Sequence, residues 1–211
     1  DHTLKLVFFI TIPASVGLIV LREPIVALLF KRGDFEVRAT LLTAQALLYY
    51  SMGLWAFSAV RIVAAVFFAL QDTRTPARMA GISIVANIFL GVVLMNPLSH
   101  GGLALATSLA SMLNLGLLLG VLRTRLGNLG WKSIAGSVCR SLLCAILMGI
   151  AVRMAVLFMV LDNRGTLPRL IGGVVCSIAV GLCVYGICSY MIKSPELRRI
   201  FIEAGRGIGK K

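Results

Sequence analysis

Apolar residues run through this chain in six long stretches separated by short polar segments. Each stretch approaches or exceeds the ~20 residues that a helix needs to cross a hydrocarbon layer. Only helices and closed barrels satisfy every backbone polar group inside lipid, and continuous rather than alternating apolar runs favour helices. The pattern predicts an all-α, polytopic membrane bundle with six transmembrane helices: Leu4–Leu21 with Ile25–Phe30, Ala39–Leu70, Met79–Met95, Leu103–Leu122, Ser141–Leu161 and Leu170–Ile192.

Several prolines and glycines lie where the predicted helices bend, turn or pack. Pro24 is expected to break or kink the first span, and Gly33 to help define the bend at its outer end. The segment Asn96–Gly102 is rich in helix-breaking residues and predicts a tight turn that joins the third and fourth spans into a hairpin. Gly116 and Gly120 form a G-x-x-x-G pattern, which indicates close helix packing.

Lys and Arg residues are distributed unequally between the two sides of the predicted bundle. Thirteen of the 21 fall on the side that holds both chain ends and the loop Gln71–Arg78, against six on the other side. The positive-inside rule therefore predicts that this loop, with Asp72, and both chain ends are cytoplasmic. Thr75 followed by Pro76 is expected to cap and begin the third span. The basic tail 193–211 is expected to lie at the anionic inner leaflet.

The composition excludes several other classes of protein. With 59% hydrophobic residues, 14% charged residues and a mean hydropathy of +0.96, the chain does not read as a water-soluble domain. The net charge of +13 does not indicate nucleic-acid binding, because the cations lie between apolar spans. The five cysteines form no C-x-x-C pair, so neither a zinc site nor a redox pair is predicted, and no cofactor is expected. No Asp or Glu lies in the middle of a span, which argues against acid–base catalysis within the membrane.

Two arginines fall inside apolar spans. A guanidinium within a span costs several kcal/mol unless it faces protein, water or an anion. For Arg61 two interpretations stand side by side: the side chain extends toward the cytoplasmic headgroups, or it lies in a central aqueous cavity and pairs with a phosphate or pyrophosphate. Arg153 is a weaker candidate for the same role, since it is also placed to reach outward or to contact lipid phosphate.

Polar residues cross the predicted hairpin as a stripe. Asn87 lies in the third span, and Thr107, Ser108, Ser111 and Asn114 lie in the fourth. Such residues commonly join membrane helices through hydrogen bonds, and we expect packing as their main role. A cation site at Asn87 and Thr107 is the alternative.

Four motifs occur in an order that resembles one transporter family. They are IPASVGLIVLREPIVALLFKRGDF, TAQALLYYSMGL, FFALQDTRTPAR and GGLALATSLASMLN. In order and spacing they resemble the second half of the MurJ (MviN) lipid II flippases, which belong to the MOP exporter superfamily. The resemblance covers about Leu4 to Leu122, and beyond that only the layout is similar.

The resemblance implies a 14-helix transporter of which this chain supplies the last six helices. Residues 1–122 would end the second lobe, 123–192 would form an additional helix pair bordering a groove for the lipid tail, and the N-terminal lobe would be missing. Since the chain begins with Asp1, it is expected to be a piece of something longer. Family members carry a basic residue on the helix before the Q-D-T-x-T-P loop, and Arg61 sits at the matching place. Related exporters place an acid one turn after an Asn, whereas Asn87 is followed by Gly91, which puts a sodium site in doubt.

The function implied by the resemblance is transport without bond chemistry. The expected cargo is lipid II or a similar polyprenyl-pyrophosphate glycolipid, moved across a bacterial inner membrane by alternating access, with membrane lipids and the missing lobe as partners. The alternatives are a flippase of another polyprenyl-linked oligosaccharide, a multidrug exporter of the same superfamily, or a membrane enzyme acting on polyprenyl phosphates. The enzyme would need a loop with clustered acids or a histidine base. The sequence has no such acid cluster, and its two histidines, His2 and His100, fall at border or loop positions without partners.

Overall fold

The computed structural model describes residues 2–30, 37–98, 100–127, 130–159, 167–192, 194 and 196. Within these ranges the chain forms six long helices and no strand. They are α1 His2–Phe30, α2 Val37–Ala69, α3 Arg74–Leu98, α4 His100–Leu126, α5 Trp131–Met159 and α6 Leu167–Met191. Each is long and apolar enough to cross a membrane. The all-α architecture and the six predicted spans are confirmed.

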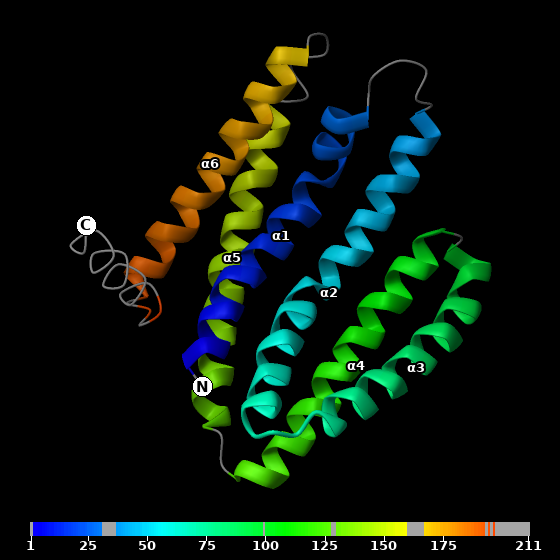
Figure 1. Ribbon diagram of the computed structural model, residues 1–211. Helices are drawn as coiled ribbons and strands as arrows, with labels where there is room; N and C mark the ends of the chain where they lie inside the picture. Colours follow the sequence, from blue (N-terminus) through cyan, green and yellow to red (C-terminus); the bar gives the residue numbers. More distant parts are fainter. Residues whose placement is uncertain are drawn as a thin grey trace, which may run out of the picture.

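The helices alternate in direction and surround α1 on two sides (Figure 1). α1 packs against α2 on one side and against α5 and α6 on the other, whereas α4 packs against α2 and α3. The start of α1, the loop after α2 and the end of α4 lie toward the lower end of Figure 1, and α6 runs downward from the top of the molecule. This is the grouping of loops that the charge asymmetry requires. α3 packs almost entirely on α4, and its outer face is apolar and exposed, for example at Val85, Phe89 and Val92.

The structure corrects three helix boundaries. α3 continues through Pro97 to Leu98 and α4 begins at His100, so the predicted turn Asn96–Gly102 is mostly helical. Gly101 and Gly102 allow α4 to approach its neighbours closely and do not form a turn. A Cβ on Gly102 would collide with the carbonyl of Leu94 in α3. α5 begins at Trp131 instead of Ser141, and the two described residues between α4 and α5, Gly127 and Gly130, are non-helical with positive φ.

The first helix continues past both of its prolines. α1 is helical through Pro13 and Pro24, so Pro24 lies within one helix rather than between two. A kink at Pro24 stays a prediction, and Gly33 lies outside the described residues. Pro13 has a consequence for packing, because the carbonyl four residues before a proline loses its helical donor.

The contact between α2 and α4 depends on a glycine that the sequence pattern did not indicate. Ser108 of α4 donates its hydroxyl to the carbonyl of Tyr49 at 2.6 Å, which confirms a packing role for this member of the polar stripe. Gly53 lies directly opposite Ser108, with no room for a side chain. The predicted G-x-x-x-G contact is wrong for this chain, since a Cβ on Gly116 or Gly120 would meet nothing within 4 Å.

Replacing Gly53 by Ala should therefore separate α2 from α4. The new Cβ would lie 2.6 Å from the Ser108 Oγ and 2.8 Å from its Cα, so the backbone itself must shift. We expect Gly53→Ala to destabilise the fold by about 1–3 kcal/mol. Gly116→Ala, in open space on α4, is the matched control and should be neutral or slightly stabilising. Thermal unfolding of the two purified variants in detergent measures the difference, and equal stability would contradict this packing.

Candidate functional site

Arg61 lies on the face of α2 that points away from the described helices. Ala59 and Val63, two residues to either side, are fully buried, and at 100° per residue this places Arg61 on the opposite side of the helix. Its side chain is exposed and makes no hydrogen bond or ion pair with any described residue. Phe68 and Tyr50, on the same side of α2, are 55% and 45% exposed.

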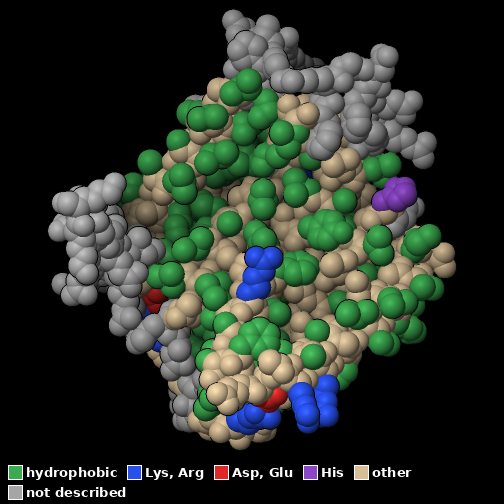
Figure 2. Space-filling view, in the orientation of Figure 1, with side chains coloured by type: hydrophobic (Ala, Val, Ile, Leu, Met, Phe, Trp, Pro, Cys, Tyr) green, Lys and Arg blue, Asp and Glu red, His purple; other side chains and the backbone are tan. Residues whose placement is uncertain are grey.

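Arg61 lies far from the end of α2, so its exposed side chain does not simply reach the headgroup region. Arg61 lies eight residues before the end of α2 at Ala69, about 12 Å along the helix axis. This is farther than one Arg side chain extends, so reaching the headgroups would require the helix to tilt or water to enter. Figure 2 shows basic side chains gathered at the lower end of the molecule, and a basic side chain also within the largely apolar face above them.

Arg153 occupies a different part of the molecule. It is exposed on α5, six residues before the end of that helix at Met159, and has no polar partner among the described residues. α1 lies between α5 and α2 (Figure 1), and Arg153 is near the end of the bundle opposite to the Asp72 loop. The structure therefore does not bring Arg153 and Arg61 together.

A polar cluster holds the loop between α2 and α3 against the end of α4. Asp72 Oδ1 accepts the backbone N–H groups of Arg74 and Thr75 at 3.1 and 3.0 Å. Its Oδ2 accepts the Thr75 hydroxyl at 2.6 Å and pairs with Arg125 Nη1 at 2.7 Å. Asp72 thus caps α3, and the predicted capping residue, Thr75, is instead the second residue of the helix, followed by Pro76. Arg125 also stands over the ring of Phe67, 6.0 Å from its centroid.

These contacts lower the pKa of the Asp72 carboxyl below its ordinary value of 3.8. The largest cause is the hydrogen bond from the Thr75 hydroxyl, followed by that from the Thr75 backbone; the charge of Arg125 acts in the same direction. The composition of the loop indicated a turn, but the part played by Arg125, fifty residues away from Thr75, had no signal in the local sequence.

The polar stripe on the α3–α4 hairpin is only partly satisfied. Thr107 donates its hydroxyl to the Leu103 carbonyl of its own helix at 2.8 Å. The amide oxygens of Asn87 and Asn114 are buried and have no hydrogen-bond partner among the described residues. Such orphaned acceptors call for a donor, a water or an ion. Gly91, one turn after Asn87, is buried against Leu103 and supplies no carboxylate.

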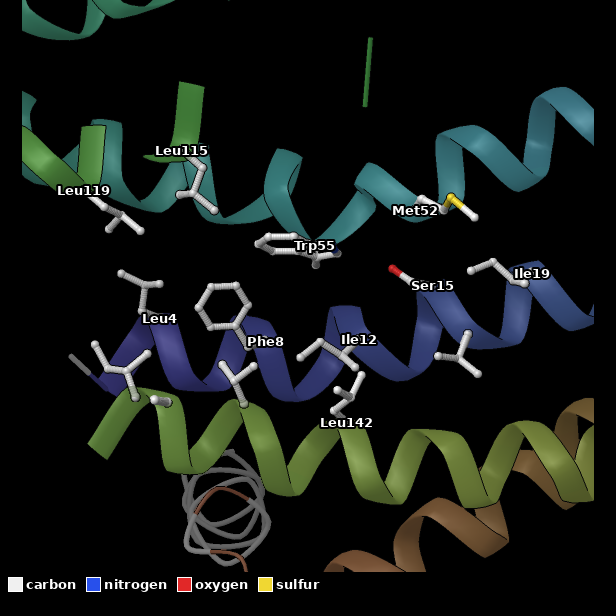
Figure 3. A pocket seen from close by; sticks show the side chains of 14 residues that line it. Leu4, Phe8, Ile12, Ser15, Ile19, Met52, Trp55, Leu115, Leu119 and Leu142 are labelled. Carbon is white, nitrogen blue, oxygen red and sulfur yellow. The ribbon is translucent and has the colours of Figure 1, made fainter. Parts of the chain in front are cut away.

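Two apolar grooves flank α1, and neither was predicted in detail from the sequence. The first, of about 610 Å³, is bounded by α1, α2, α4 and α5. Figure 3 shows Phe8 of α1 and Trp55 of α2 facing each other across it, with ring centroids 6.1 Å apart. The second, of about 540 Å³, lies between α1, α5 and α6 and includes Pro13 and Tyr185. Both could accommodate hydrocarbon chains, since nearly all of their lining is carbon.

These helices define a polytopic, all-helical membrane protein, and comparison with known proteins gives the family. The family model described as "Lipid II flippase MurJ" matches residues 1–168. The chain belongs to this family. It is a multi-pass bacterial membrane protein.

Named relatives and a solved structure agree with this assignment. The chain is 31% identical over 210 residues to "Probable lipid II flippase MurJ" of Rhizobium meliloti (strain 1021), covering 98% of this chain and 39% of that protein. It is 38% identical over 118 residues to the protein of the same name from Vibrio cholerae serotype O1, covering 56% of this chain and 22% of the relative. The solved structure "Lipid II flippase MurJ, inward closed conformation" matches with a TM-score of 0.74 and 26% identity, over 90% of this chain and 37% of that one. The chain spans less than two fifths of these proteins.

The Asp72 cluster generates a prediction about pH. A depressed pKa in the folded state means that the charged Asp72 stabilises the fold above the unfolded pKa near 3.8, and that this contribution is lost as the pH falls through the lower folded value. Wild-type protein should therefore lose thermal stability in acid more steeply than Asp72→Asn, which keeps an acceptor oxygen but no titration. Melting curves of the two proteins between about pH 5 and pH 3 test this. Parallel losses in both would show that Asp72 does not contribute.

Proposed function

We propose that this chain is the C-terminal part of a lipid II flippase that moves the headgroup of this lipid-linked peptidoglycan precursor from the inner to the outer leaflet. The observation that carries the proposal is the family match over residues 1–168, which includes Arg61 and the Asp72 loop. Transport in this family needs no bond to be made or broken, so the protein is proposed not to be an enzyme. The preceding lobe would be supplied by the part of the protein that the relatives have and this chain lacks.

Arg61 is the residue proposed to face the cargo. An exposed guanidinium about 12 Å from the helix end, on the face of α2 that no described helix covers, needs water or an anion. A cavity shared with the missing lobe would provide water, and the pyrophosphate of the cargo would provide the anion, which suits the planar fork of Arg. Arg153 is a secondary candidate, because it lies on another helix and at another depth.

The rest of the chain is assigned by the same proposal. α1 to α4, within residues 1–122, would close the second lobe, and α5 and α6, within 123–192, would be the additional pair packed on α1. The apolar grooves beside α1 would receive the polyprenyl tail while the headgroup crosses by alternating access. Both chain ends and the Asp72 loop would face the cytoplasm of a bacterium, with the basic tail 193–211 on the inner leaflet.

The polar stripe is proposed to serve helix packing first. Ser108 already joins α4 to α2 through the Tyr49 carbonyl. The free amide oxygens of Asn87 and Asn114 leave room for a bound water or cation at the α3–α4 interface. Thr107, whose hydroxyl is held by its own helix, would contribute to a cation site only through its second lone pair.

Substitution of Arg61 in the full-length protein tests the proposed function. Arg61→Ala should lower lipid II transport at least tenfold at unchanged expression, because the pairing with a desolvated phosphate is lost. Arg61→Lys keeps the charge and should retain part of the activity. Arg78→Ala, an exposed Arg in the first turns of α3, is the matched control. The measurement is lipid II exposed on the outer leaflet of cells depleted of the native protein.

Two results would count against this assignment. Full transport by Arg61→Ala would remove Arg61 from the cargo path. Depletion of the protein without accumulation of lipid II would direct the assignment to another polyprenyl-linked cargo, since loss of a lipid II flippase blocks the precursor on its inner leaflet.

A further inference from the structure

Pro13 leaves one carbonyl of α1 without its helical donor. In an α-helix each backbone N–H donates to the carbonyl four residues earlier, and a proline has no N–H. Because α1 is helical through Pro13, the carbonyl of Phe9 is the group left free. Phe9 is only 5% exposed, so water is not at hand to satisfy it. A buried carbonyl within a membrane span needs another donor.

Tyr185 of α6 supplies that donor. Its hydroxyl donates to the Phe9 carbonyl at 2.7 Å, and the side chain is 8% exposed. The two aromatic rings also pack together, with centroids 5.2 Å apart and planes inclined by 51°. Among the described residues no other hydrogen bond joins α6 to α1. One side chain thus satisfies the group that Pro13 frees and attaches the last described helix to the first.

We propose that Tyr185 is a positioning residue that holds α6 on α1 and so sets the width of the groove between α1, α5 and α6. Phe9, Pro13 and Tyr185 all line that groove, so a shift of α6 changes its shape directly. The family match ends at residue 168, just after α6 begins at Leu167, so this attachment is argued from the residues of this chain alone. Only its consequence for transport rests on the proposed function.

The reactivity of Cys144 reports the position of α6 without any transport assay. Cys144 is 2% exposed and belongs to the same buried cluster as Phe9 and Tyr185. In full-length protein with Cys144 as the sole cysteine, we expect Tyr185→Phe to raise the rate of modification by N-ethylmaleimide about threefold, the size expected for one interhelical hydrogen bond in a membrane. Tyr190→Phe removes a hydroxyl from a 75% exposed tyrosine of the same helix and should leave the rate unchanged.

The same substitution made in a Pro13→Ala protein distinguishes the hydrogen bond of Tyr185 from the packing of its ring. In Pro13→Ala the new N–H donates to the Phe9 carbonyl, which then no longer depends on Tyr185. The effect of Tyr185→Phe on Cys144 modification should therefore shrink toward none in that background. An equal rise in both backgrounds, or no rise in the native one, would overturn the proposal, because Tyr185 would then act through its ring or not at all.

Cys144 modification and lipid II transport are independent readouts. Arg61→Ala, which should lower transport at least tenfold, should leave Cys144 modification as in the wild type, since Arg61 faces away from α6. If the proposed function fails, the labelling result still decides whether Tyr185 positions α6. If the labelling pattern fails while Arg61→Ala is inactive, the proposed function stands and the positioning role does not.

Discussion

Lipid offers no partner for a backbone N–H or carbonyl, and this constraint governs the whole molecule. It forces each apolar run into a helix that satisfies its own backbone, and it makes every departure from that pattern need a specific remedy. Pro13 is such a departure, and the hydroxyl of Tyr185 on α6 supplies the hydrogen-bond donor that Pro13 lacks. The short loop after α2 is another, and Asp72 caps the free N–H groups of the next helix there.

The same constraint explains how these helices associate. Apolar side chains gain little by leaving lipid for one another, so close backbone approach and hydrogen bonds carry more of the association than in a soluble protein. Gly53 allows Ser108 to reach the Tyr49 carbonyl, and Gly102 allows α4 to touch the backbone of α3. These contacts join α4 to α2 and to α3, while α1 packs against α2 on one side and against α5 and α6 on the other.

Much of the fold followed from the sequence, because the length and continuity of the apolar runs are one-dimensional properties. The six spans and their alternation were predicted in this way. Which helices pack together was not predicted, because packing depends on which helix faces meet in three dimensions. Gly116 and Gly120 have the spacing of a packing motif but face open space, whereas Gly53 lies in the contact between α2 and α4. For the same reason the contacts of Arg125 with Asp72 and of Tyr185 with Phe9 could not be predicted, since the partners are distant in sequence. Arg61 could be picked out in advance, since a lone guanidinium in an apolar run is visible in the sequence itself.

The central claim is that the open face of α2 borders water once the whole protein is assembled, with Arg61 as its cation. The direct measurement is the reaction of Arg61→Cys with a charged, water-soluble thiol reagent in full-length protein whose native cysteines, including the five of this chain, have been replaced. Ile88→Cys serves as the lipid-facing comparison, since Ile88 is 64% exposed on the outer side of α3. The account predicts rapid modification at position 61 and little at position 88. Protection at position 61 equal to that at position 88 would place this face against lipid or protein and contradict the claim.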